Sequence, residues 1–184
     1  SRLTNELMVT LVVGRRPKIL HDLAMDIAHG IAEVAGVHLH VNSEPGNAIF
    51  HVRDGVIHTR PLEGKRTIED EIGGVRLRVG PGDFFQANPA MANRIVDDVL
   101  SLSADLRDRP VVDLYSGVGA IALPLAQQHP WVGGIEVSGG AVDRARESAA
   151  AARLSAEFLA GTVAERLPDF VDRVKDAAPV VILD

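Results

Sequence analysis

Strand-like and helix-like patterns alternate through the second half of the chain, and this alternation constrains the fold more than any other feature. Short apolar runs predict strands at 111–115, 131–136, 157–160 and 180–184. Amphipathic stretches predict helices between them at 120–128, 141–153 and 163–167. Strands that alternate with helices form parallel sheets with right-handed crossovers. The pattern therefore predicts an α/β fold with a parallel sheet over residues 81–184.

The first 80 residues follow a different pattern. Apolar residues from Leu20 to Val34 recur at steps of three and four, which predicts one helix that ends at Gly36. Further strands are predicted at 7–13, 37–42, 48–52, 67–72 and 75–79. The last two flank Gly73-Gly74, which is typical of a hairpin. We therefore predict two domains, an α+β domain over 1–80 with antiparallel pairing and an α/β domain over 81–184.

Composition excludes several kinds of protein. The chain has no cysteine, so its own residues form no disulfide, zinc–thiolate site or iron–sulfur cluster. No apolar run is long enough to span a membrane, and the first residues lack the layout of a signal peptide, so we expect a soluble cytoplasmic protein without a membrane partner. The net charge is −6, which excludes nucleic-acid binding through overall charge alone. His38 and His40 share a strand face without a nearby carboxylate, so we expect a solvated face and no metal site.

A glycine-rich turn follows the apolar strand that begins at Val111. Gly117 and Gly119 allow a sharp turn and a close approach of a ligand to the N-terminus of the next helix. Together with Ala122 they fit the G-x-G-x-x-A pattern of dinucleotide-binding folds. The pattern alone leaves three interpretations open: a structural turn without a ligand, a nicotinamide or flavin site, and a site for S-adenosylmethionine (SAM).

Two acidic residues favour SAM among these ligands. Asp113 lies four residues before Gly117, at the end of the strand. Its charge would repel a pyrophosphate but is compatible with the cationic methionine end of SAM. Glu136 ends the next predicted strand, where an acid commonly binds both ribose hydroxyls of a nucleotide. We therefore predict SAM as the cofactor.

These motifs together resemble the RNA uracil-5-methyltransferases. The resemblance rests on Asp113–Gly119 (DLYSGVG), Phe84–Asn88 (FFQAN), Gly134–Glu136 (GIE) and Val181–Asp184 (VILD). It spans essentially the whole chain and implies the family's central domain followed by a class I, Rossmann-like methyltransferase sheet. Such a sheet has seven strands in the order 3-2-1-4-5-7-6, and this chain would supply the first four. The resemblance therefore implies a piece of a longer protein, truncated after strand 4.

The resemblance also implies which residues contact the cofactor. The implied positions are Gln86, Tyr115, Ala120, Glu136, Thr162 and Asp184, in addition to Asp113, Gly117 and Gly119 of the glycine turn. The sequence departs from the family in three places. Ser116 replaces a common cysteine, Ala120 replaces Thr or Asn, and Thr162 replaces Asp or Asn.

The implied reaction is methylation of uridine C5 in rRNA or tRNA. The family adds a cysteine thiolate to C6, and a general base later removes the C5 proton. In the family both residues follow the motif that begins at Asp184, so we predict no catalytic residue in this chain and no activity of the chain alone. The unpaired edge of the last strand is expected to pair with another chain or with missing residues. The alternatives are a class I methyltransferase acting on a protein or small molecule, and a SAM- or RNA-binding domain without catalysis.

Overall fold

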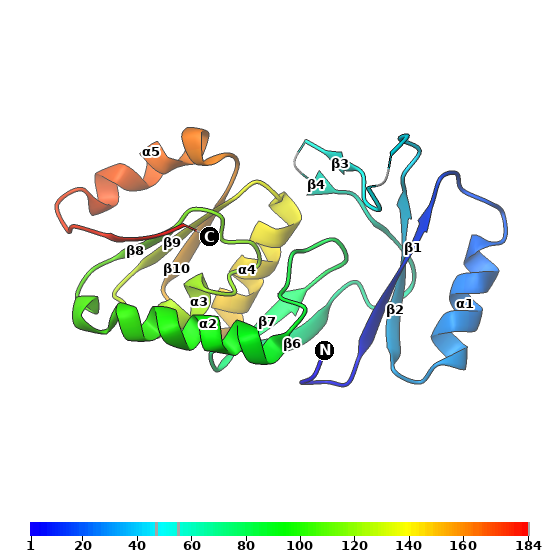
Figure 1. The fold of residues 1–184 in the computed structure, drawn as a ribbon, viewed down its shortest axis with the longest axis horizontal. Helices are drawn as coiled ribbons and strands as arrows, with labels where there is room; N and C mark the ends of the chain where they lie inside the picture. The colour runs from blue at the N-terminus through cyan, green and yellow to red at the C-terminus, as the bar shows by residue number, and fades with distance from the viewer. Residues whose placement is uncertain (47, 55, 184) are drawn as a thin grey trace. The chain divides into compact units, whose positions relative to one another are not determined.

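The computed structural model describes residues 1–46, 48–54 and 56–183 (Figure 1). The chain forms two compact units, one of residues 1–70 with 79–83 and one of residues 71–78 with those from Phe84 onward. Residues 71–78 come from a hairpin of β6 (Ile68–Ile72) and β7 (Val75–Val79). This hairpin was predicted, and its apolar side chains belong to the core of the second unit. Residues 71–78 therefore belong to the second unit, although the chain returns to the first unit at 79–83. The domains predicted from the sequence meet at residue 80.

The first unit contains a three-stranded sheet in the order β1-β2-β5. Its elements are β1 (Leu7–Val13), α1 (Leu20–Gly30), β2 (Val34–Val41) and β5 (Arg60–Gly64), and a short ribbon adds β3 (Val52–Arg53) and β4 (Val56–Ile57). Strands β1 and β2 are parallel, and β2 and β5 are antiparallel. A small core forms between α1 and the sheet, around Ala24, Val34 and Val37.

Three predictions for this unit differ from the structure. The helix ends at Gly30 and not at Gly36, because Val34 already pairs with Leu7 as the first residue of β2. The antiparallel pairing holds for β2 and β5 but not for β1 and β2. The eleven-residue helix α1 forms the crossover connection that the parallel strands β1 and β2 require. Of the strand predicted at 48–52, only Val52 is in a strand.

The predicted solvated face of His38 and His40 is also wrong, because both side chains are only 2% exposed. The Nε2 atom of His38 lies 3.0 Å from the carbonyl oxygen of Lys65. His40 Nδ1 lies 2.8 Å from the carbonyl oxygen of His58, and its Nε2 accepts a hydrogen bond from the His51 N–H. No group of three or more metal-binding side chains occurs in the described part of the chain.

The second unit is built on a four-stranded parallel sheet in the order β10-β9-β8-β11. Its strands are β8 (Val111–Asp113), β9 (Val132–Glu136), β10 (Ala156–Ala160) and β11 (Val180–Ile182). Its helices are α2 (Pro89–Leu102), α3 (Ala122–Leu125), α4 (Gly139–Ala152) and α5 (Val163–Val174), with a short 3₁₀ helix, η1 (Ala104–Leu106). This is the strand order expected for strands 3-2-1-4. Pairing of the outer edge of β11 with another chain stays a prediction.

Helices cover both faces of this sheet. On one face, side chains of α2, α3 and α4 pack with Val111, Val132 and Phe158 of the sheet. On the other face, Phe170 and Val174 of α5 pack with Val112 of β8 and Ile135 of β9. No helix in the described residues is both long and apolar enough to cross a membrane.

Helix lengths differ from the prediction where a proline interrupts the pattern. Helix α3 has four residues instead of the nine predicted, since Pro124 has no N–H to donate to the Ala120 carbonyl. Helix α5 continues past Pro168 to Val174, seven residues beyond the predicted end. The start of α2 is as expected, because Asn88 caps it and accepts hydrogen bonds from the N–H groups of Ala90 and Met91.

Buried His38 makes the stability of the first unit depend on pH. Burial lowers the pKa of His38 below its ordinary value of 6.5, and the nearby Arg66 charge lowers it further, although the Lys65 carbonyl opposes the shift. The unfolded chain therefore binds more protons as pH falls through 6.5, and the free energy of unfolding decreases there. We expect a decrease of at most about 1.4 kcal/mol per pH unit, measured by urea unfolding between pH 7.5 and 5.

The variant His38→Gln should flatten this slope, while His21→Gln, at an exposed position of α1, should keep it. The pH window avoids Glu6 and Glu165, whose pKa values lie below 4.5 because of hydrogen bonds from Lys65 and Thr162. Equal slopes in the parent chain and His38→Gln would contradict this assignment.

Candidate functional site

The glycine turn is held at the carboxyl edge of the sheet by hydrogen bonds to both neighbouring strands. Asp113 ends β8 and is 2% exposed. After it, the Leu114 N–H donates to the Ile182 carbonyl on β11 (3.1 Å), and the Ser116 N–H donates to the Ile135 carbonyl on β9 (3.0 Å). The turn therefore starts from a fixed position between the two strands.

The two glycines of the turn have different roles. Both have positive φ, +53° at Gly117 and +86° at Gly119, a region that disfavours other residues. A Cβ atom at Gly119 would lie 2.9 Å from Leu123 Cγ and 3.2 Å from Phe158 Cζ. A Cβ atom at Gly117 would meet no atom within 4 Å. Gly119 is therefore required for core packing, whereas the backbone at Gly117 borders open space.

The carboxylate of Glu136 links this turn to the next strand–helix connection. Its Oε2 accepts a hydrogen bond from the Gly117 N–H at 3.1 Å, and its Oε1 accepts one from the Ser138 N–H at 2.7 Å. Glu136 ends β9, and Ser138 is the N-cap of α4. A carboxylate oxygen accepts two hydrogen bonds, so each oxygen keeps one lone pair for a further donor.

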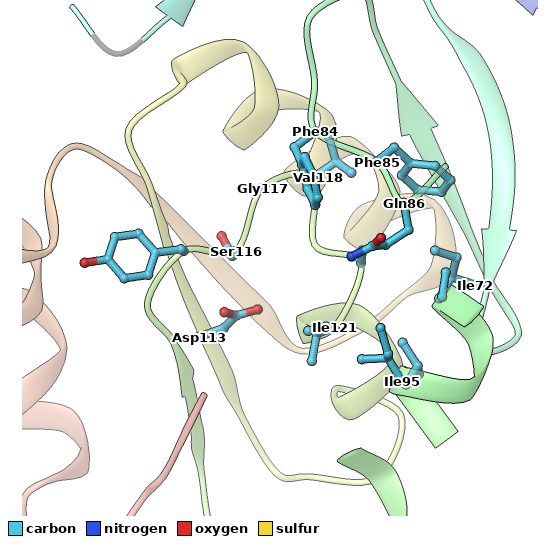
Figure 2. A pocket seen from close by; sticks show the side chains of 14 residues that line it. Ile72, Phe84, Phe85, Gln86, Ile95, Asp113, Ser116, Gly117, Val118 and Ile121 are labelled. Atoms are coloured by element: carbon cyan, nitrogen blue, oxygen red, sulfur yellow. The ribbon is translucent and has the colours of Figure 1, made fainter. Parts of the chain in front are cut away.

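A pocket opens beside the glycine turn, and five predicted site residues line it: Gln86, Asp113, Tyr115, Gly117 and Ala120. In Figure 2 the Gln86 amide and the Asp113 carboxylate reach toward the same open space from opposite sides. The pocket encloses about 580 Å³, including solvent at its mouth. Apolar walls with a few polar groups are typical of small-molecule sites.

The apolar walls of the pocket were not predicted as such, although Phe84, Phe85 and Val118 belong to the FFQAN and DLYSGVG motifs. They are formed by Ile72, Phe84, Phe85, Ala92, Ile95, Val96, Val118 and Ile121. Ile72 comes from the hairpin, and the walls at Ala92, Ile95 and Val96 come from α2 (Figure 2). The FFQAN element indicated that the start of α2 is near the site, but no local pattern indicated that the hairpin reaches it.

Ser116 also lines the pocket, at a position where the family that the sequence resembles commonly has a cysteine. Its side chain is 6% exposed, and its Oγ atom has no hydrogen-bond partner among the described residues.

The remaining predicted residues lie outside the pocket lining. Gly119 is buried below the turn, and Glu136 contacts the turn through Gly117. Thr162 is exposed and forms a capping box at the start of α5, in which its Oγ1 accepts from the Glu165 N–H and the Glu165 carboxylate accepts from the Thr162 N–H. Thr162 follows β10, so it still lies at the carboxyl edge of the sheet. Asp184 lies outside the described residues.

Comparisons with known proteins give relatives named as RNA methyltransferases, although no family model matches the chain. An uncharacterized RNA methyltransferase of Geobacter sulfurreducens is 35% identical over 173 residues, which cover 94% of this chain and 34% of the relative. One of Gloeobacter violaceus is 34% identical and matches 98% of this chain and 38% of the relative. The chain thus spans little more than a third of the length of these relatives.

Solved structures show the same fold. The tRNA (uracil-54, C5)-methyltransferase of Pyrococcus abyssi, crystallised with S-adenosyl-L-homocysteine, is 25% identical, with a TM-score of 0.62 over 85% of this chain and 36% of that chain. The tRNA m1G37 methyltransferase of Methanocaldococcus jannaschii has a TM-score of 0.54 and 15% identity, over 94% of this chain and 56% of that chain. The chain is therefore similar in sequence to RNA methyltransferases and has an α/β methyltransferase fold.

Proposed function

We propose that this chain forms the SAM-binding part of a class I RNA methyltransferase that modifies uracil C5. One observation carries the proposal: Gln86, Asp113 and Gly117 line a single pocket at the carboxyl edge of β8, and Glu136 is hydrogen-bonded to Gly117. Ligands of open α/β sheets bind at this edge. The RNA methyltransferase relatives and the structural similarity to a tRNA (uracil-54, C5)-methyltransferase support the same function.

The residues of the site fit SAM. Glu136 keeps two acceptor lone pairs for the ribose hydroxyls, and the backbone of Gly117 leaves room for a ligand to approach. The Asp113 carboxylate is suited to the cationic end of SAM, and the Gln86 amide both donates and accepts hydrogen bonds. When bound, SAM supplies an electrophilic methyl group. Tyr115, Ala120, Thr162 and Asp184 remain proposed contacts.

The proposed substrate is a uridine of rRNA or tRNA. Uracil C5 is a weak nucleophile, so its methylation requires a thiolate that adds to C6 and a base that removes the C5 proton. None of the 184 residues is cysteine. We therefore place the nucleophile and the base in other residues of a longer protein. These 184 residues hold the cofactor.

The first test is the binding of S-adenosylhomocysteine to the chain. Hydrogen bonds to a charged group contribute about 1.5–3 kcal/mol, so Glu136→Ala should weaken binding about 10- to 150-fold, measured by calorimetry. Glu147→Ala is the matched control, because Glu147 lies on the exposed surface of α4 and pairs with Arg78. Unchanged affinity in a folded Glu136→Ala variant would contradict the assignment of the ribose contact.

The second test concerns catalysis. The purified chain, incubated with methyl-labelled SAM and unmodified rRNA and tRNA, should transfer no label above background, because it has no thiolate. Label in 5-methyluridine would show that the inferred thiolate chemistry is wrong. Label at another base, or in protein, would show that the methyl acceptor is not uracil C5.

A further inference from the structure

The connection between β1 and α1 carries an unusual concentration of positive charge. Arg15, Arg16 and Lys18 lie within four residues, and we call this segment, residues 14–18, the basic loop. No acidic residue occurs between Glu6 and Asp22. All three side chains are exposed, and none of them has a hydrogen-bond or ion-pair partner in the described part of the chain. Their charge is therefore available to a partner molecule.

Several other exposed cations of the chain, by contrast, pair with neighbouring acids. Lys65 pairs with Glu6, Arg94 pairs with Asp98, and Lys175 pairs with Asp172. The chain as a whole has a net charge of −6. Such a protein attracts a polyanion only where positive charge is concentrated locally. The basic loop is such a place.

The fold presents the basic loop at one end of the first unit. Strands β1 and β2 are parallel, so their carboxyl ends lie side by side, and the Asn42 N–H after β2 donates to the Val13 carbonyl at the end of β1. The loop begins directly after this hydrogen bond. Figure 1 shows it as the connection between the end of β1 and α1. Pro17 restricts the backbone between Arg16 and Lys18. The three cations therefore project from an anchored connection.

We propose that the basic loop binds the phosphate backbone of the RNA substrate. This inference rests on the proposed function, because it names the part of the chain that holds the RNA. Arginine and lysine side chains at an exposed loop contact phosphate oxygens without reading bases. The loop contributes affinity that depends on salt and that is independent of RNA sequence and of SAM.

The experiment measures binding of a fluorescently labelled 20-nucleotide single-stranded RNA by anisotropy, with the full chain and without SAM, between 50 and 300 mM KCl. Each phosphate contact to a single strand adds about 0.7 to the slope of log affinity against log salt. The variant R15Q/R16Q/K18Q should therefore lower the slope by about 2 and the affinity about 100-fold at 0.1 M salt. These side chains are exposed and unpaired, so thermal unfolding should be unchanged.

The control is K65Q/R94Q/K175Q, which removes the same charge from positions that pair with acids. It should lower the slope by less than 1. Equal losses in the two variants would show an effect of net charge alone and would overturn the proposal. An unchanged slope in the basic-loop variant, or no RNA binding by the parent chain at 50 mM KCl, would also overturn it. The calorimetry with S-adenosylhomocysteine tests the cofactor site alone. A failure of the basic-loop proposal therefore leaves the cofactor assignment unchanged, and the reverse also holds.

Discussion

The Glu136 carboxylate is the interaction on which the candidate site depends. It accepts hydrogen bonds from the N–H groups of Gly117 and Ser138, so one side chain connects the turn after β8 with the turn after β9. Hydrogen bonds to a charged acceptor are stronger than those between neutral groups. They hold Gly117 in its positive-φ conformation. A turn fixed in advance reduces the ordering that binding would otherwise require.

Packing within the second unit also fixes the position of the glycine turn. Gly119 packs against Leu123 and Phe158, so the turn cannot move away from the sheet without opening the core. The hairpin and α2 supply the apolar wall opposite the turn. Polar groups are concentrated at the carboxyl edge, and this separation suits a ligand with one charged end and one apolar face.

The order of the four strands was implied by the family resemblance. The local sequence patterns were sufficient to predict the parallel sheet and the position of the glycine turn. These features depend on local signals such as the run at Val111 and the cap at Asn88. Features that depend on distant residues were missed. His38 is buried and contacts the carbonyl of Lys65, which follows β5, and α5 passes Pro168 because Phe170 packs in the core.

The candidate site also combines features that local patterns predict with features that depend on distant residues. The sequence indicated Asp113, Gly117 and Glu136 because an acid at a strand end and a glycine in a turn are local patterns. It did not indicate that Ile72 of the hairpin lines the pocket, since that contact forms only when the unit is folded. The Thr162–Glu165 capping box is also a local pattern, and the cofactor contact that the resemblance implies for Thr162 remains a proposal.

The central claim is that SAM binds at the carboxyl edge of β8 and β9. The most direct measurement is a titration of the ¹⁵N-labelled chain with S-adenosylhomocysteine, followed by amide chemical shifts. We expect the largest shift changes at the Gly117, Gly119 and Ser138 amides and almost none in α1. Saturable changes confined to the first unit, or none at millimolar ligand, would contradict it.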